Sequence, residues 1–555
     1  MKKSFLYAAL AGAFLSLGSC QDYIQEENLG NVLIDEYYQT QDGYLSLINS
    51  AYSTLRDVYG NEPWVFCAGT DMYVEGRSDQ PPGISEYLTL TASNGEVTTF
   101  YTNVYQAIQT CNIAIHTNGQ TAATDNLPVL LGEMKFLRAY YYFLLVQQFG
   151  GVPLVTDVYA YAENGTSFTR NSAEEVYTFI LNEMNEAMNL VPESQAFGKV
   201  NKRVIRHYLA KVHLTRGYET FAAADDFTKA AQYADEAIAG QALTLSFRDL
   251  FFPGNEVNEE VLFSVQYDIA SIQDPLDDGN MQNYYFGPYL GGEGQQNGYP
   301  YRSYMLVPTM YTFDLFTEND SRFDNSFMVY FYDRYYDYYD RNESLGDLNI
   351  RYYYVPKWEL DDTTAWRAAD LEHRANTELR PYSAAWEASN STVLDAATPI
   401  VSKFDDPTAR FSGSGSSTRD IYLARLAETY LIAAEAYFKT GNLGTAAERI
   451  NEVRRRAAKP GTESEMMITA ADVDIDFILD ERGRELLGEY HRWNDLKRTG
   501  TLVERTELYN RDIRAIVNSG LDPFRGTNGA LKILRPIPQN AIDLNDADVS
   551  QNPGY

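Results

Sequence analysis

The fold is decided by the stretch Tyr430-Leu431-Ile432-Ala433-Ala434-Glu435-Ala436-Tyr437. Its apolar residues recur at helical spacing, which predicts a helix over 420–440. Gly441 predicts the turn, and Ala446 and Ile450, four positions apart, continue the pattern in a second helix over 444–458. Small side chains at Ala434 and Ala446 would let the two helices approach closely. The stretch therefore predicts a closely packed helix pair.

The same pattern occurs elsewhere in the chain. The spacing is that of a tetratricopeptide helix pair. Leu209-Ala210-x2-His213 with Ala230-x3-Ala234 is a second copy, with a longer turn. Ala187 and Pro192 end a third copy, whose beginning would lie far upstream near Ala139 and Tyr142. Several copies in one chain predict a scaffold of stacked helix pairs, hence a mainly α fold.

Other segments also have helical periods. Helices are predicted over 38–60, 99–116, 129–149, 173–190, 201–217, 227–239 and 474–499. The segment 265–420 differs, because it has few helical periods, many turn formers and clusters of tyrosine. A loop-rich segment of this length inside a helical protein is usually functional. We therefore expect a loop-rich, partly β insert with a functional role.

The N-terminus has the layout of a secretory signal. Lys2 and Lys3 precede an apolar run from Phe5 to Leu17, which is too short to span a membrane as a helix. Leu17-Gly18-Ser19-Cys20 resembles a bacterial lipobox, in which Cys20 receives lipid after cleavage. Plain cleavage that leaves an ordinary cysteine is the alternative. The anchor would then be the lipid on Cys20.

The net charge and the cysteine and histidine content bear on nucleic-acid binding, disulfide formation and metal binding. The net charge of −32 repels phosphate backbones, which argues against nucleic acid as a partner. Cys67 and Cys111 could form a disulfide in an exported protein or remain as two buried thiols, and their spacing does not decide. No metal-ligand pattern of Cys and His is present. Structural calcium is compatible with the many acids, but no calcium-binding loop motif supports it, so no cofactor is predicted.

These patterns divide the chain into five parts. They are a signal peptide over 1–19, a lipidated tether over 20–36, an N-terminal helical part over 37–264, the variable loop-rich ligand-binding insert over 265–420, and a C-terminal helical pair with a closing segment over 421–555.

Four segments, in this order, resemble the SusD/RagB family of outer-membrane nutrient-binding lipoproteins. They are Leu137-Arg138-Ala139-Tyr140-Tyr141-Tyr142-Phe143 with Phe149-Gly150-Gly151-Val152-Pro153-Leu154; Ala424-Arg425-Leu426-Ala427-Glu428-Thr429-Tyr430-Leu431-Ile432-Ala433-Ala434-Glu435-Ala436; Glu481-Arg482-Gly483-Arg484-Glu485-Leu486-Leu487 with His491-Arg492-Trp493-Asn494-Asp495-Leu496-Lys497-Arg498-Thr499-Gly500; and Arg535-Pro536-Ile537-Pro538-Gln539 with Gln551-Asn552-Pro553-Gly554-Tyr555. The resemblance spans nearly the whole mature chain.

The resemblance implies both a fold and a function. The fold is a set of tetratricopeptide-like helix pairs that supports a variable, loop-rich region. The function is capture of a polysaccharide or oligosaccharide at the outer membrane, facing the cell exterior, and delivery to a SusC-like TonB-dependent barrel. A minority branch of the family handles peptides instead. A tetratricopeptide-type adaptor that binds only protein partners is a further alternative.

The segment around His491 contains a pair of acids that invites an enzymatic interpretation. Glu481 and Glu485 lie four apart on one helix face with His491 nearby, and paired carboxylates do serve glycoside hydrolysis when they flank a bond. Carboxylates on adjacent turns of one helix share a side and cannot straddle a sugar. We expect Arg482, Arg484 and Arg492 to pair with these acids instead. No catalytic residue is therefore predicted.

Sugars are held by aromatic rings stacked on their C–H faces and by polar groups at their edges. The resemblance places the glycan site on early loops and on the insert. The predicted stacking residues are Tyr73, Tyr285, Tyr289, Tyr301 and Trp358, and the predicted edge contacts are Asp71 and Arg77.

Overall fold

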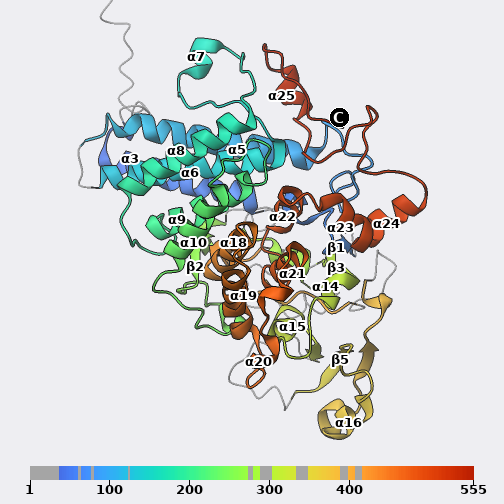
Figure 1. Cartoon of the computed structure of the whole chain (residues 1–555). Helices are drawn as coiled ribbons and strands as arrows, with labels where there is room; N and C mark the ends of the chain where they lie inside the picture. The colour runs from blue at the N-terminus through green and yellow to red at the C-terminus, as the bar shows by residue number, and fades with distance from the viewer. Residues whose placement is uncertain are drawn as a thin grey trace, which may run out of the picture.

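The computed structural model describes residues 37–60, 64–76, 80–122, 126–272, 279–287, 303–332, 348–387, 398–406 and 416–555. Helices dominate, as predicted (Figure 1). The longer ones are α3 (Gln41–Tyr59), α5 (Gly95–Asn118), α6 (Leu127–Phe149), α8 (Ala173–Leu190), α9 (Lys202–Arg216), α10 (Asp226–Ile238), α18 (Leu426–Lys439), α19 (Leu443–Ala457), α21 (Ile475–Glu485), α23 (Leu502–Tyr509) and α24 (Arg511–Asn518). Shorter ones include α4 (Trp64–Cys67), α12 (Gln282–Phe286), α14 (Met310–Asp314), α15 (Ser321–Ser326) and α22 (Arg492–Arg498).

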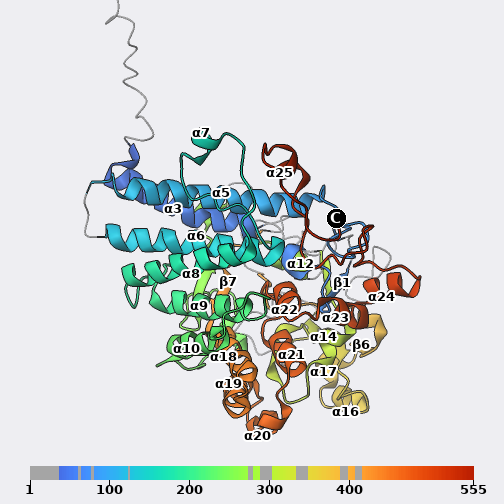
Figure 2. The same ribbon diagram turned by 45° about the horizontal axis from the view of Figure 1, so that its top comes forward.

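The long helices pack as a series of pairs, and each pair contacts the next. Helices α3 and α5, α6 and α8, α9 and α10, and α18 and α19 contact each other pairwise, and α5–α6 and α10–α18 join one pair to the next. Figure 2 shows α3, α5, α6, α8, α9 and α10 lying one above another. The three predicted helix pairs, including the third with its distant beginning, are therefore confirmed.

The pair formed by α18 and α19 is as close as its sequence implied. Ala433, Ala434 and Ala446 are completely buried, and the cluster around them includes residues of α9, α10 and α21. Gly441 lies between the helices with φ of +81°, a left-handed conformation that glycine adopts without steric cost. Burial of these small side chains confirms that the helices approach closely.

The described strands form small sheets. Strands β2 (Val261–Val265) and β7 (Ile421–Arg425) pair antiparallel and bring the two ends of the insert together. Strands β1 (Tyr73–Glu75) and β3 (Leu306–Pro308) also pair antiparallel. Within the insert, β5 (Ile350–Val355) lies between β4 (Tyr330–Tyr332) and β6 (Glu378–Pro381). The helix predicted from residue 420 thus begins only at Leu426, because β2 holds 421–425 as a strand.

The helix predicted over 474–499 is wrong in its middle. Helix α21 ends at Glu485, and α22 begins at Arg492. Between them Gly488 and Tyr490 have φ of +75° and +64°, so the backbone cannot continue as a helix. The break turns Glu489 inward, where its carboxylate accepts hydrogen bonds from Arg425 Nε at 2.7 Å and Lys403 Nζ at 2.5 Å. The buried ion pairs of Glu489 with Arg425 and Lys403 thus accompany a break in the helix that the apolar spacing did not predict.

The two remaining cysteines are buried free thiols, which settles the alternative that their spacing left open. Burial raises the pKa of Cys111 to about 12, and it raises the pKa of Cys67 further. Among the described residues, no helix is both long enough and apolar enough to cross a membrane.

Candidate functional site

Strands β1 and β3 join the early loop to the insert. Tyr73 lies opposite Pro308, and Glu75 lies opposite Leu306. At the end of this ladder, Gly76 N donates to Met305 O at 3.1 Å and Tyr304 N donates to Gly287 O at 3.0 Å. The described residues that border segments 77–79 and 288–302 therefore lie together. The two regions expected to carry the ligand site share one face of the molecule.

The base of this face is closely packed. A Cβ atom at Gly76 would lie 1.9 Å from the carbonyl oxygen of Tyr304, so only glycine fits there. Tyr304 itself has φ of +29°, an unfavourable conformation for a residue with a side chain. Gln80 bridges the two segments, because its Nε2 donates to Val74 O and to Met305 O, each at 2.9 Å. The backbone at Gly76 and at Tyr304, where the early loop and the insert meet, is therefore fixed by close packing and hydrogen bonds.

The turn between α23 and α24 covers the other edge of β1. Asn510 Nδ2 donates to Thr70 O at 2.7 Å and to Tyr73 O at 2.9 Å. The Asp512 carboxylate accepts from Glu75 N at 2.9 Å. The C-terminal region thus belongs to this face, although no ligand contact was predicted there from the sequence.

Asp71 is not an exposed edge contact, and that prediction is wrong. Its carboxylate is completely buried and accepts hydrogen bonds from Arg492, at 2.7 and 2.6 Å, and from Arg505 Nε at 3.0 Å. These two guanidinium groups hold the pKa of Asp71 below its ordinary value in spite of burial. Both oxygens are engaged by protein, so Asp71 organises the face from beneath.

Tyr73 and Tyr285 are not exposed stacking residues either. Both are buried, with the Tyr73 ring edge-on to Phe286 at 5.5 Å and the Tyr285 ring edge-on to Trp64 at 4.9 Å. Both rings belong to the main hydrophobic core of the molecule. The prediction that they form a sugar platform is wrong, and they instead support the backbone of the face.

Trp358 is half-buried, and its ring packs edge-on against buried Phe323 of α15 at 4.9 Å. It lies in the turn after β5 at the margin of the core, and its assignment as a stacking residue stays a prediction. Arg77, Tyr289 and Tyr301 fall outside the described residues, so their assignment to the ligand site stays a prediction.

An aromatic pair that was not predicted from the sequence lies beside the ion pair of Asp71 and Arg492. Tyr311 of α14 and Tyr509 of α23 are half-buried and stack with ring centroids 4.0 Å apart and planes 21° apart. The Tyr311 hydroxyl donates to Asp480 Oδ1 at 2.5 Å and also contacts Arg505. The available signal was the four-residue spacing of Arg505 and Tyr509, which places both on one helix face.

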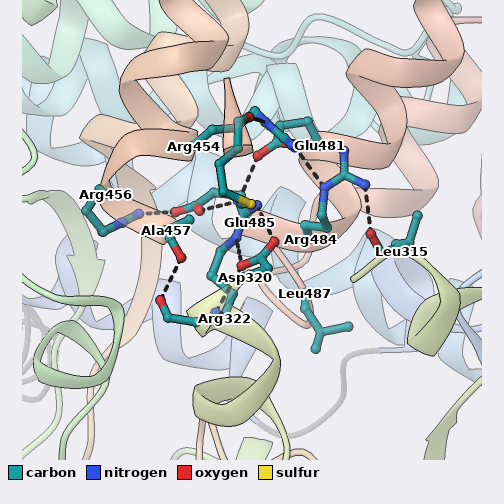
Figure 3. Close-up of polar contacts among 12 residues, drawn as sticks. Leu315, Asp320, Arg322, Arg454, Arg456, Ala457, Glu481, Arg484, Glu485 and Leu487 are labelled. Carbon is teal, nitrogen blue, oxygen red and sulfur yellow. Dashed lines mark hydrogen bonds and ion pairs between the residues drawn. The ribbon is translucent and has the colours of Figure 1, made fainter. Parts of the chain in front are cut away.

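The acids of the suspected enzymatic motif are structural. Figure 3 shows Glu481 and Glu485 surrounded by Arg322, Arg454, Arg456 and Arg484. Both carboxylates are completely buried, and the guanidinium groups hold their pKa values far below the ordinary range against the effect of burial. Arg484 pairs with Glu481 as expected, whereas Arg482 pairs with Asp495 and Arg492 with Asp71. The network ties Arg322 of the insert to α21, so the structural interpretation of this acid pair is confirmed.

Within the part of the chain that the structure describes, no three His, Cys, Asp or Glu side chains gather in a way that could hold a metal ion.

Comparison with known proteins places the chain in context. Residues 221–555 match the model described as the SusD family, and residues 39–214 match the model described as starch-binding associating with outer membrane. The chain is 24% identical to SusD-like protein P2 of Formosa agariphila, with 98% of each chain covered. It is 27% identical to starch-binding protein SusD of Bacteroides thetaiotaomicron, covering 76% of this chain and 72% of that one.

Solved structures have the same fold. A laminarin-binding SusD-like protein superimposes with a TM-score of 0.67 at 22% identity, covering 93% of this chain and all of the other. Surface glycan-binding protein A of Bacteroides thetaiotaomicron, in complex with laminarihexaose, gives a TM-score of 0.67 at 18% identity, with 93% and 100% covered.

Proposed function

Because this chain belongs to the SusD family, we propose that it captures an oligosaccharide at the bacterial surface and passes it to a SusC-like TonB-dependent barrel. Relatives support the ligand class, since one is a starch-binding protein and structural neighbours bind laminarin or laminarihexaose. The alternative is capture of a peptide, as in the peptide-capturing branch of the family, and the experiment below distinguishes the two ligands.

One structural observation carries the proposal. The β1–β3 ladder brings the early loop and the insert to one face, and these are the two regions that would supply aromatic rings and edge contacts. Arg77, Tyr289 and Tyr301 lie in segments that start from the closely packed base of this face. An open platform of this kind would bind weakly, because each stacking contact contributes only about 1 kcal/mol beyond area burial. Weak binding suits a protein that hands its ligand on.

The proposed location and partner rest on the same family membership. The protein would be held at the outer membrane by lipid on Cys20 and would face the cell exterior as a lid over the barrel. The signal-like N-terminus and the family model described as associating with outer membrane support this placement.

We propose binding without turnover. The strongest candidates for a catalytic acid pair, Glu481 and Glu485, are buried and fully occupied by arginine. Their role in the scaffold leaves them no access to a glycosidic bond.

Isothermal titration calorimetry against a panel of plant, fungal and bacterial polysaccharides tests the function. We expect micromolar-to-millimolar affinity for an oligosaccharide of several units, with little dependence on salt. Tyr289→Ala should weaken binding roughly tenfold, whereas Tyr159→Ala, at an exposed tyrosine near α7 (Ala160–Asn164), should leave it unchanged. Binding of extended peptides with no glycan bound would overturn the proposal. Release of reducing ends from a bound glycan would overturn the absence of turnover.

A further inference from the structure

We infer that Tyr311 and Tyr509 form a saccharide subsite that takes an uncharged, hydroxyl-rich sugar unit. This subsite would extend the ligand surface onto the C-terminal segment, which lies outside the early loop and the insert. The inference rests on the proposed glycan-binding function and adds to it a location and a charge class of ligand.

The aromatic pair is preassembled. The two rings are nearly parallel, and the guanidinium carbon of Arg505 lies 5.2 Å from the Tyr311 centroid and 5.4 Å from the Tyr509 centroid. Both side chains remain half-buried rather than buried, unlike Tyr73 and Tyr285. Among the described residues, none hydrogen-bonds the Tyr509 hydroxyl. A held aromatic surface with a polar tip is suited to a sugar, which offers a C–H face and hydroxyl edges.

Two carboxylates stand at the edge of the pair. Arg505 Nη1 donates to Asp476 Oδ1 at 2.6 Å, and Arg505 Nη2 donates to Asp480 Oδ1 at 2.6 Å. In the described structure the Oδ2 atoms of both aspartates accept no hydrogen bond, and the Asp476 side chain is 70% exposed. These oxygens are placed to accept hydrogen bonds from sugar hydroxyls, and such charge-assisted bonds are the stronger kind.

The charge balance selects against acidic sugars. Arg492 and Arg505 contribute two positive charges, and Asp71, Asp476 and Asp480 contribute three negative ones, so the cluster is net negative. The positive groups are nearly buried, whereas Asp476 faces solvent. The net charge of the whole chain, −32, adds a repulsive field. A uronic or sulfated unit would therefore be disfavoured here relative to a neutral one.

The subsite is continuous with the loop-bearing face. Tyr509 directly precedes Asn510, whose side chain binds the carbonyls of Thr70 and Tyr73 along β1. Figure 1 shows α14, α21 and α23 gathered beside β1 and β3. Strand β1, which is three residues long and spans roughly 7 Å from first to last, runs from Tyr73 to the base of the loops. One oligosaccharide of several units could therefore reach both.

The test is calorimetry with neutral hexasaccharides, including laminarihexaose and maltohexaose, beside oligogalacturonate as the anionic probe. We expect the wild type to bind a neutral hexasaccharide and to bind oligogalacturonate at least tenfold more weakly. Tyr509→Ala should weaken the neutral ligand about fivefold to tenfold, because the ring face is lost. Tyr509→Phe should bind nearly as the wild type does, and Asp476→Asn should weaken binding about threefold. Tyr159→Ala is the matched control at a distant exposed tyrosine. Circular dichroism should show every variant folded.

Each other result counts against the inference. Neutral binding that Tyr509→Ala and Asp476→Asn leave unchanged would overturn the subsite while the proposed function stands. Preferential binding of oligogalacturonate would overturn the charge class. Failure of the wild type to bind any saccharide would overturn the proposed function and the subsite together. If Tyr509→Ala alone fails to fold, unchanged affinity in Asp476→Asn would still overturn the subsite.

Discussion

Arg492 and Asp71 form a two-point ion pair, with N–O distances of 2.7 and 2.6 Å, although 421 residues separate them. The pair is buried, and Arg505 adds a third hydrogen bond to the same carboxylate. It joins the early loop to α22 and α23, so the C-terminal region helps to hold the face that is expected to carry the ligand site.

Removing this carboxylate should destabilise the protein strongly. Asp71→Ala leaves the buried charges of Arg492 and Arg505 without their interior partner, which typically costs about 3–5 kcal/mol. Urea denaturation should show this loss in the free energy of unfolding. Asp522→Ala removes an exposed partner of Arg525 and should change it by no more than about 0.5 kcal/mol. Equal effects of the two variants would contradict the role of the buried pair.

Overpacking the helix pair should be costly. Ala434→Trp places a large ring where α18 has no free space, because Ala434 is completely buried. Such insertions cost about 1–3 kcal/mol and sometimes more, so the melting temperature should fall by several degrees. Ala515→Trp, at an exposed site on α24, is the control. A melting temperature within a degree or two of the wild type would contradict the close approach of α18 and α19.

His491 is buried and uncharged, so this side chain should contribute a loss of stability as pH falls below 6.5. Its Nδ1 accepts from Lys211 Nζ at 3.2 Å, and Glu428, Arg482 and Asp495 lie around it. Burial lowers the pKa of His491 to about 3, helped by the charges of Lys211 and Arg482 and opposed by Glu428. The unfolded chain takes up the proton below pH 6.5 while the folded chain does not, so acid favours unfolding.

Between pH 7 and pH 5 this group alone should cost about 2 kcal/mol. His207, also buried with a lowered pKa, acts in the same direction, whereas Asp420, whose pKa burial raises to about 6, acts in the opposite one. The comparison of His491→Gln with the wild type therefore isolates the contribution of His491. Glu428, Glu481 and Glu485 have lowered pKa values and contribute losses only below about pH 4.5, outside this window. His491→Gln should flatten the pH dependence measured by urea denaturation. A slope identical to that of the wild type would show that the imidazole is accessible to protons.

The two cysteine thiols should not react in the native protein. With Cys20→Ala as the background, a thiol reagent at pH 8 should label neither Cys67 nor Cys111, because burial raises both pKa values and blocks access. In denaturant two thiols should react per chain. No reaction in denaturant would indicate a disulfide between them.

Anchoring depends on Cys20 if the N-terminus is a lipoprotein signal. Cys20→Ala should leave the fold intact and release the protein from membranes, because no other strong anchor is predicted from the sequence. Fractionation after a salt wash measures the release, and circular dichroism checks the fold. Sedimentation of the variant with membranes would refute lipid anchoring.

The helical scaffold could be predicted because its signal is local. Apolar spacing, the turn at Gly441 and the small residues of the pair are visible within about 30 residues of sequence, and the predicted helices agree with α8 and α9 to within one residue at each end. The prediction failed at Gly488 to Tyr490, where the helix is broken by inward-facing Glu489 and its partners from distant parts of the chain.

The sequence by itself determined the helix pairs and the family, because periodicity and motif order are properties of neighbouring residues. It also predicted the two regions that the structure brings to one face. Only the tertiary structure decided which aromatic rings of that face remain accessible. Tyr73 and Tyr285 lie in the expected regions but are buried by segments far away in sequence, whereas Tyr311 and Tyr509 meet only after α14 and α23 have packed. Exposure of a tyrosine depends on what the rest of the chain places against it, and long-range packing is not encoded in the spacing of its neighbours.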